Sequence, residues 1–320
     1  MLPRRPMRRG ALTLLRRSND GHRRTWRQEW DEAPPYMRAM VLGTATVCGV
    51  FVVSHIETMP HTGRRRLMFL SHAAEEQLGE RAYQEILRSE RLLPSTHPMS
   101  RTVARVGAKI VETSNEPRMK WRFHVIDSPE PNAFCLPGIR TCNSQDERRS
   151  HRAQGLTDLC QGGKVFVHTG LFKILSNEDT LAAVMFHEAA HGVARHGAEK
   201  VSFSLLVYGL LAFLLPDFGQ LGDLVVHLAV DLPFSRKLEL EADSLGLRLM
   251  AKACYDPRAS LQMHAALGKL HERQPPKYFS THPPSEERMQ AARRQLRDAM
   301  TIYETSGCFE RKEAFHQLTR

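Results

Sequence analysis

The chain has 320 residues, with 45 lysines and arginines against 35 acidic residues, 42% apolar residues and 7% aromatic residues. A chain of this length can bury a self-supporting core, and its apolar content excludes a disordered chain. Six cysteines are too few for a small disulfide-stapled scaffold. The composition therefore predicts a globular protein, with a net charge of +10 whose position along the chain has to be explained.

The excess positive charge lies at the N-terminus. Residues 1–30 contain nine arginines, no lysine and two acids, which give +7 of the net +10. Because this charge sits in an arm and not on a domain face, the sequence argues against a nucleic-acid partner. The composition of residues 1–38 is typical of a mitochondrial transit peptide with a matrix-side arm, and a solvated basic tail is the alternative. The start of the chain lacks the apolar stretch of a secretory signal, which argues against a secreted enzyme.

The next segment, residues 39–56, is an uncharged and mostly apolar stretch of 18 residues. As a helix it would be about 27 Å long, close to the roughly 30 Å of a bilayer's hydrocarbon core. Prolines and glycines on both sides separate it from any core, which favours a transmembrane helix over a buried core helix. The nine arginines of residues 1–30 precede it and three arginines follow it, at 64–66, so the N-terminus is expected in the more negative compartment.

The residues after this segment predict a mostly helical α+β domain over residues 57–305. Residues 67–115 show helical periodicity, and the apolar stripe of the second half contains four residues, namely Val103, Val106, Ile110 and Val111. Residues 121–126 and 164–168 alternate like strands of a small sheet.

The C-terminal half contains one further apolar run, residues 202–215, of only 14 residues. That length is short for a membrane span and is typical of a buried or interfacial helix, which would hold a cleft against the bilayer. Residues 306–320 are expected to form a C-terminal tail.

The most informative stretch is SNEDTLAAVMFHEAAHGVARH, residues 176–196. Its start can cap a helix, and on that helix His187 and His191 project from the same face and can share a tetrahedral Zn²⁺. Glu188 lies about 100° around the helix, where it can reach a metal-bound water. Two histidines and a glutamate on a solvated helix face are the alternative interpretation.

A zinc site needs a third protein ligand. His196 would point away from the metal on a continuing helix, because it lies five residues beyond His191. The better candidate is Glu239 in the later helix SRKLELEADSLGLRLM, with Asp243 four residues further on to hold a histidine N–H. Glu241, between these two acids, is expected on a solvated face.

Three motifs occur in order: the H-E-A-A-H helix, the S-R-K-L-E-L-E-A-D helix, and T-H-P-P-S-E-E-R at residues 281–288. Together they resemble the zinc metallopeptidase family that includes the CAAX prenyl proteases and the bacterial HtpX proteases. Three further motifs, T-G-R-R-R, N-A-F-C-L-P-G and G-G-K-V-F-V-H-T-G-L-F, are similar to its mitochondrial branch. Those are stress-activated inner-membrane proteases whose activity overlaps with the m-AAA protease. The resemblance covers about residues 57–305.

The resemblance implies a zincin-like metallopeptidase domain that holds one Zn²⁺ through three protein ligands, namely His187, His191 and Glu239. Glu188 would be the general base and acid, and His282 would stabilise the oxyanion of the tetrahedral intermediate. Asp243 would hold a ligand by a hydrogen bond, and Arg288 would brace the site.

The resemblance also implies partners and a location. Substrates would be membrane-anchored proteins of the mitochondrial inner membrane, a dynamin-like fusion GTPase among them, cleaved in stress response and protein quality control. The catalytic domain would face the intermembrane space, in agreement with the arginine asymmetry, and inner-membrane lipid would be a second partner. A homo-oligomer is compatible with the sequence. The strand at 164–168 would pair with an extended substrate by strand addition.

The chain departs from the family pattern at residues 139–162, where 24 mostly polar residues interrupt L-P-G-G-K-V. A long polar loop inside a strand–turn–strand unit is unusual. One interpretation is a tolerated surface insertion, and the preferred hypothesis is a translated retained intron, which the transcript would decide. The insertion favours an alternative function, an impaired scaffold that keeps the metallopeptidase fold, whereas the intact site residues argue against it.

The six cysteines include two in the insertion, Cys142 and Cys160. Cys254 and Cys308 flank the C-terminal part. In an oxidising intermembrane space these two could form a disulfide, and two buried thiols are the alternative.

Overall fold

The computed structural model describes residues 26–116, 119–136, 163–214, 232–273, 282 and 286–308. The chain divides into two units, residues 1–55 and 56–320. The greater part of the predicted transit peptide, the insertion at 139–162 and most of the C-terminal tail lie outside the described residues.

The N-terminal unit consists of two helices, α1 (Trp26–Glu32) and α2 (Pro35–Ser54). Pro35 occupies the first turn of α2, where its fixed φ and missing N–H suit a helix start. No residue of α2 is buried, and within the described part of the chain it is the one helix that length and composition would allow to cross a membrane. It begins four residues before the predicted span and ends two residues before its end.

The second unit begins with a hairpin, in which β1 (Ile56–Thr58) pairs antiparallel with β2 (Arg65–Leu67). Residues 67–115, predicted to be helical, contain two helices, α3 (His72–Ser89) and α4 (Pro98–Ser114). Along α4 three residues of the predicted stripe are buried, but Val111 is half exposed and does not belong to the core. Asn115, in the left-handed conformation, ends this helix.

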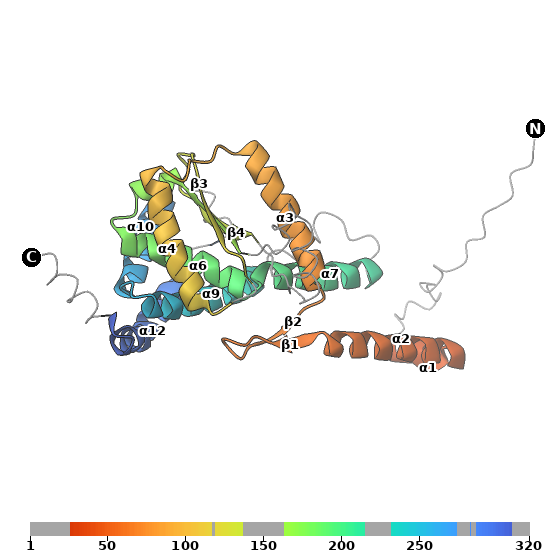
Figure 1. The fold of residues 1–320 in the computed structure, drawn as a ribbon. Coiled ribbons are helices and arrows are strands. Elements are labelled where there is room, and N and C mark those ends of the chain that lie inside the picture. The colour runs from red at the N-terminus through yellow and green to blue at the C-terminus, as the bar shows by residue number, and fades with distance from the viewer. Residues whose placement is uncertain are drawn as a thin grey trace, which may run out of the picture. The chain divides into compact units, whose positions relative to one another are not determined.

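A three-stranded sheet lies next in the chain, formed by β3 (Arg122–Ile126), β4 (Ala133–Leu136) and β5 (Lys164–His168). The strand order is β3-β5-β4, with β3 parallel and β4 antiparallel to β5. All five β5 residues are buried, because Phe166 packs on the α3 side while its neighbours in β5 face the main core with α4 and α6 (Figure 1). The prediction that β5 pairs with a substrate is wrong, since both of its edges are occupied, and β4 is the edge strand beside α6.

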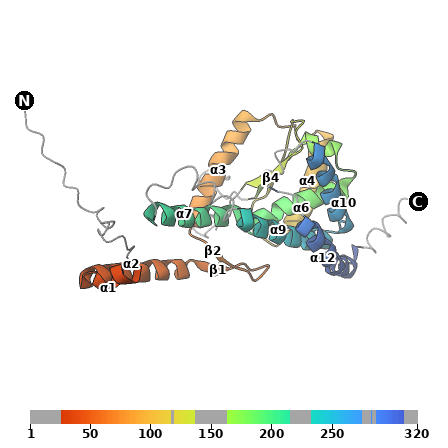
Figure 2. The ribbon, with the colours of Figure 1, turned by 180° about the vertical axis from the view of Figure 1, so that it is seen from behind.

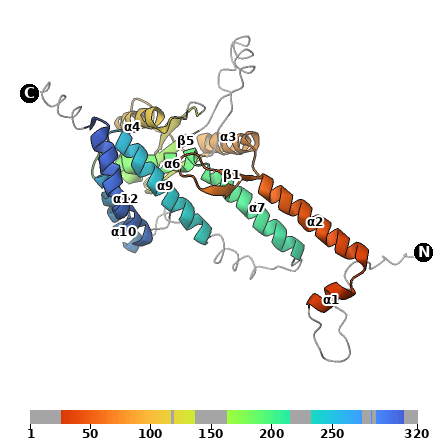
Figure 3. The same cartoon turned by 90° about the horizontal axis from the view of Figure 1, so that it is seen from below.

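The rest of the unit is helical, and its elements follow in chain order: η1 (Thr169–Lys173), α6 (Glu178–Val193), α7 (His196–Leu214), α9 (Leu232–Lys252), α10 (Arg258–Arg273) and α12 (Glu286–Thr305). Helix α6 lies at the centre, with almost every residue buried, and α9 packs along it. Helix α12 packs in turn on α9 (Figure 3). Helices α10 and α12 lie at the same end of this unit (Figure 2). Gly246 of α9 permits the close approach to α6, because an added Cβ would lie 2.9 Å from the carbonyl oxygen of Phe186.

Helix α6 does not continue into α7. Ala194 caps α6, and Arg195 takes the left-handed conformation with a φ of 54° before α7 begins at His196. Helix α7 thus starts six residues before the predicted apolar run, and in its described part Leu205 is 61% exposed. Ser202 of the same helix is buried, and its Oγ accepts hydrogen bonds from the backbone of Phe69 and Leu70.

A disulfide joins Cys254, just after α9, to Cys308, just after α12. The two cysteines therefore pair, as one of the two alternatives drawn from the sequence expected. Cys142 and Cys160 lie outside the described residues.

Candidate metal centre

The first part of the site is fixed by α6, whose start is determined locally. Asn177 accepts a hydrogen bond from the N–H of Thr180, and the Thr180 hydroxyl accepts one from the N–H of Asn177. This capping box and the two acids of the first turn set the phase of the helix. His187 and His191 consequently lie on one face, and the His187 side chain is almost completely buried.

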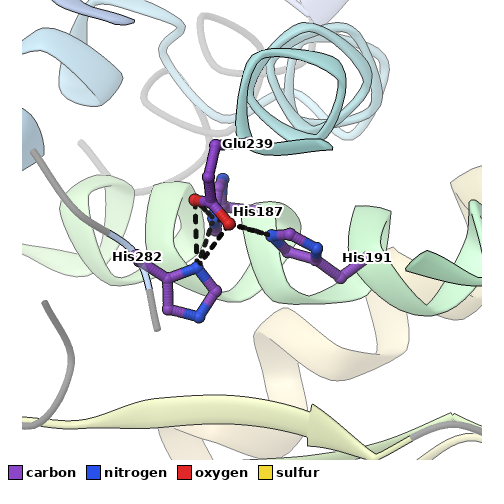
Figure 4. Close-up of side chains that lie close together, drawn as sticks. All are labelled: His187, His191, Glu239 and His282. Carbon is purple, nitrogen blue, oxygen red and sulfur yellow. Dashed lines mark hydrogen bonds and ion pairs between the residues drawn. The ribbon is translucent and has the colours of Figure 1, made fainter. Parts of the chain in front are cut away.

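Four side chains from three parts of the chain converge at this face (Figure 4). The Nε2 atoms of His187 and His191 lie 3.2 Å apart. Glu239 of α9 places Oε2 3.3 Å from Nε2 of His187 and Oε1 3.3 Å from Nε2 of His191. His282 places its Nδ1 atom 3.0 Å from the Glu239 carboxylate and 3.3 Å from His187 Nε2. All four ligand atoms lie within 4.8 Å of one another, so this group can hold one metal ion.

The donor set fits a transition-metal ion chemically. Three imidazole nitrogens and one carboxylate oxygen face a common point, and nitrogen and carboxylate ligands together suit such ions better than Mg²⁺ or Ca²⁺. His187, Glu239 and His282 are buried, so only His191 is in partial contact with solvent.

Asp243 and Arg288 lie behind His187. Asp243 Oδ1 is 2.8 Å from His187 Nδ1, the nitrogen that faces away from the other donors. Arg288 of α12 donates two hydrogen bonds to Asp243, at 2.7 and 2.8 Å, and its third nitrogen lies 3.0 Å from Glu239. Burial opposes ionisation of Asp243, but the charge and hydrogen bonds of Arg288 hold the pKa of this carboxyl well below its usual range. Arg288 thus orients two acids that both face His187.

Glu188 lies beside the donor group and is 1% exposed. Burial raises the pKa of Glu188 to about 8, although the His187 charge and the backbone of Cys135 on strand β4 lower it. One carboxylate oxygen lies 3.5 Å from His282 Nε2, so Glu188 and the second nitrogen of His282 face the same space. The structure therefore brings together all seven residues that the sequence analysis selected for the site.

A further set of residues, missed by the sequence analysis, lies behind His191. Glu241 was expected on a solvated face, but it is 7% exposed because the hairpin between β1 and β2 covers it. His196 is outside the donor group, as expected, but not for the expected reason, since the helix ends before it. Its Nδ1 lies 2.9 Å from His191 Nδ1. The signal that could have pointed to this cluster is T-G-R-R-R, because Thr62 and Arg64 both contact Glu241.

Comparisons with known proteins agree with this arrangement. Residues 155–296 match the family described as Peptidase family M48. The mitochondrial metalloendopeptidase OMA1 of Schizosaccharomyces pombe is 38% identical over 271 residues, which cover 82% of this chain and 72% of that protein. The chain belongs to peptidase family M48. This membership confirms the predicted metalloendopeptidase and its mostly helical metallopeptidase domain.

Two further relatives are less similar in sequence. The human metalloendopeptidase OMA1 is 28% identical over 320 residues, which cover 88% of this chain and 56% of that protein. The Beta-barrel assembly-enhancing protease of Escherichia coli is 28% identical over 255 residues, 74% of this chain and 47% of that protein.

Proposed function

We propose that this M48 peptidase is a membrane-anchored zinc endopeptidase of the mitochondrial inner membrane, with its catalytic domain toward the intermembrane space. The observation that carries the proposal is the group of four donors, His187, His191, Glu239 and His282, beside the buried Glu188. Its role would be to cleave membrane-anchored proteins in stress response and protein quality control.

Zinc is the metal that these donors suit best, one ion per chain. Three of the four, His187, His191 and Glu239, would hold it, and His282 is left to act on the substrate. Catalytic zinc sites typically use three protein ligands of histidine and carboxylate type. When bound, zinc supplies a Lewis acid that polarises a carbonyl and makes water reactive near neutral pH.

The chain's own residues supply the proton transfers. Glu188 is the general base, and burial raises the pKa of its carboxyl group toward neutral pH, which suits it to accept and return a proton. His282 faces Glu188 through Nε2, from where an N–H can donate to the oxyanion of a tetrahedral intermediate. Arg288 and Asp243 keep His187 and Glu239 in place during these steps.

Strand β4 is the edge to which an extended substrate would add. It is an outer strand of the sheet, it packs against α6, and the backbone of Cys135 faces Glu188. A substrate paired with this edge would have its backbone beside Glu188. Pairing through the backbone depends little on the substrate's side chains, which suits a quality-control peptidase that must accept many sequences.

Anchoring is assigned to α2, whose 20 residues span about 30 Å as a helix, the thickness of a hydrocarbon core. The names of the OMA1 relatives place them in mitochondria. The arginine asymmetry around α2 then favours the N-terminus in the matrix. Partners would be inner-membrane lipid and membrane-anchored substrates, a dynamin-like fusion GTPase among them, and a homo-oligomer is compatible with this arrangement.

The test is cleavage of a membrane-anchored model substrate by the full chain, which is loaded with one equivalent of Zn²⁺ and reconstituted in lipid vesicles. Wild type should cut and a chelator should stop it, whereas Glu188→Gln should bind zinc and remain inert. Glu178→Gln is the matched control, because it changes an acid of the same helix that lies in the first turn and contacts Arg105. It should cut like wild type.

The insertion at 139–162 favours the second candidate, an impaired scaffold, because it begins shortly after edge strand β4 ends at Leu136. If wild type and Glu188→Gln both bind one zinc and neither cuts, the scaffold is supported. Deletion of residues 139–162 then tests whether the insertion is the cause, since the shortened chain should recover activity.

A further inference from the structure

His191 has a second, buried set of contacts on the side opposite to the donor group. Its Nε2 faces Glu239, and its Nδ1 lies 2.9 Å from Nδ1 of His196. The other ring nitrogen of His196, Nε2, lies 3.1 Å from a carboxylate oxygen of Glu241. His196 and Glu241 are 3% and 7% exposed, so water competes little for these contacts.

The three residues His191, His196 and Glu241 thus form a row of hydrogen-bonded side chains, and the hydrogens along this row can be placed in one consistent way. If His191 uses Nε2 as a ligand, its neutral ring carries the hydrogen on Nδ1 and donates it to Nδ1 of His196. The neutral His196 ring then carries its hydrogen on Nε2 and donates it to Glu241. Each nitrogen has one role, and the row ends on a carboxylate.

The left-handed residue Arg195 makes this row possible. On a continuous helix a residue five positions after His191 would be rotated by about 140° from it. Because α6 ends at Val193 and Arg195 turns the chain with a φ of 54°, the His196 ring returns to the ring of His191.

Glu241 is itself held by the hairpin that follows the N-terminal unit. Arg64 donates from Nε to one Glu241 oxygen at 2.7 Å, and the Thr62 hydroxyl donates to the other. Arg64 also donates two hydrogen bonds of 2.6 Å to Glu199. The guanidinium thus already neutralises the acids near His196, which argues against a second metal ion in this cluster.

We propose that His196 is a positioning residue for His191, and that Glu241, Thr62 and Arg64 hold His196 in turn. The row orients one metal ligand from the hairpin, while Asp243 orients the other histidine from the opposite side. The proposal rests on the proposed function, because it takes His191 as a zinc ligand. It adds the hairpin of residues 56–67 to the parts on which the metal centre depends.

The test measures Zn²⁺ affinity of the full chain by competition with a chelator, and the visible absorption of the Co²⁺-loaded protein. His196→Leu keeps the bulk but removes both ring nitrogens, and we expect a 10- to 100-fold loss of affinity, as for other outer partners of metal-binding histidines. His196→Asn should recover part of that loss, because its side-chain oxygen can accept from His191. The Co²⁺ spectrum should change in His196→Leu, since the His191 ring is no longer oriented.

The matched control is Glu75→Gln, which breaks a buried ion pair with Arg195, the neighbour of His196, and leaves the row intact. It should lower stability but leave affinity within about twofold of wild type and the Co²⁺ spectrum unchanged. Arg64→Lys acts at the more exposed end of the row, where a lysine cannot bond Glu199 and Glu241 together. It should weaken binding several-fold, and it carries the test if His196→Leu fails to fold.

Wild-type affinity in His196→Leu, or in Arg64→Lys where that variant carries the test, overturns the proposal. So does an equal loss in Glu75→Gln, because the effect would then be general destabilisation of the α6–α7 junction. Failure of the proposed function is distinguishable from both, since the wild type itself would then bind no zinc or cut no substrate.

Discussion

The separation of α6 and α9 is predicted to depend on Gly246, and Gly246→Ala tests it. An added Cβ would lie 2.9 Å from the Phe186 carbonyl oxygen and 3.1 Å from Cα and N of His187. These are backbone atoms of α6, so no side chain can move aside, and the helices must separate by about 0.5 Å to reach ordinary contact. Because α9 carries Glu239 and α6 carries His187, the same displacement pulls two metal donors apart.

The expected magnitude is the difference between two effects. Overpacking of this kind costs about 1–3 kcal/mol, and replacing glycine by alanine inside a helix returns about 1 kcal/mol. The free energy of unfolding should therefore fall by about 0–2 kcal/mol, and zinc affinity should fall as well. Gly268→Ala in α10 is the matched control, since nothing lies within 4 Å of its added Cβ. It should raise the free energy of unfolding by about 0.5–1 kcal/mol and leave zinc affinity unchanged.

The assay is urea unfolding of the full chain in detergent, with zinc affinity measured on the same preparations. Equal stabilisation by Gly246→Ala and Gly268→Ala, with wild-type zinc affinity in both, would refute the reasoning. The glycine would then be incidental to the spacing of the two helices.

Three further predictions concern charge, the disulfide and the metal. Burial opposes ionisation of Glu241, but hydrogen bonds from His196 and Arg64 lower the pKa of this carboxyl to about 2 from its ordinary 4.5. Wild type should therefore be more stable than Glu241→Gln, with the full difference present above pH 5 and smaller by about 1–2 kcal/mol at pH 3. Unfolding curves at several pH values measure this difference. A difference that does not change with pH would contradict the prediction. The Cys254–Cys308 bond closes a separation of 54 residues, so replacing both by serine should cost about 2–4 kcal/mol, and reductant should lower the melting temperature of wild type only. With free zinc at 1,000 times its Kd, removing the zinc should lower the free energy of unfolding by about 4 kcal/mol and the melting temperature by about 10 °C. Glu239→Ala should abolish this metal dependence.

What the sequence predicted well is what depends on local spacing. His187, Glu188 and His191 share one helix, so a four-residue interval determines their directions before any tertiary structure is known. The length of an apolar run likewise predicted α2, and alternation predicted β3 and β5. The roles of Glu239 and His282 required more, because these residues lie 52 and 95 positions after His187.

What the sequence did not predict depends on which segments become neighbours. The order β3-β5-β4 puts the strand nearest to α6 in sequence at the centre of the sheet, which alternation alone cannot show. Glu241 has the pattern of a solvated acid on its own helix, and it is buried because the hairpin with Arg64 covers it. His196 was placed by assuming an uninterrupted helix, and one left-handed residue invalidated the angle.

The donors of the metal centre are spread along the chain in a way that affects biogenesis. A ribosome or a translocase delivers the chain N-terminus first, so α6 emerges long before Glu239, and His282 and Arg288 follow near the end. A half-delivered chain holds the H-E-A-A-H helix but lacks the partners that close the site around it. The proposed metal centre is therefore complete only after His282 and Arg288 have been delivered, about 90 to 100 residues after His187.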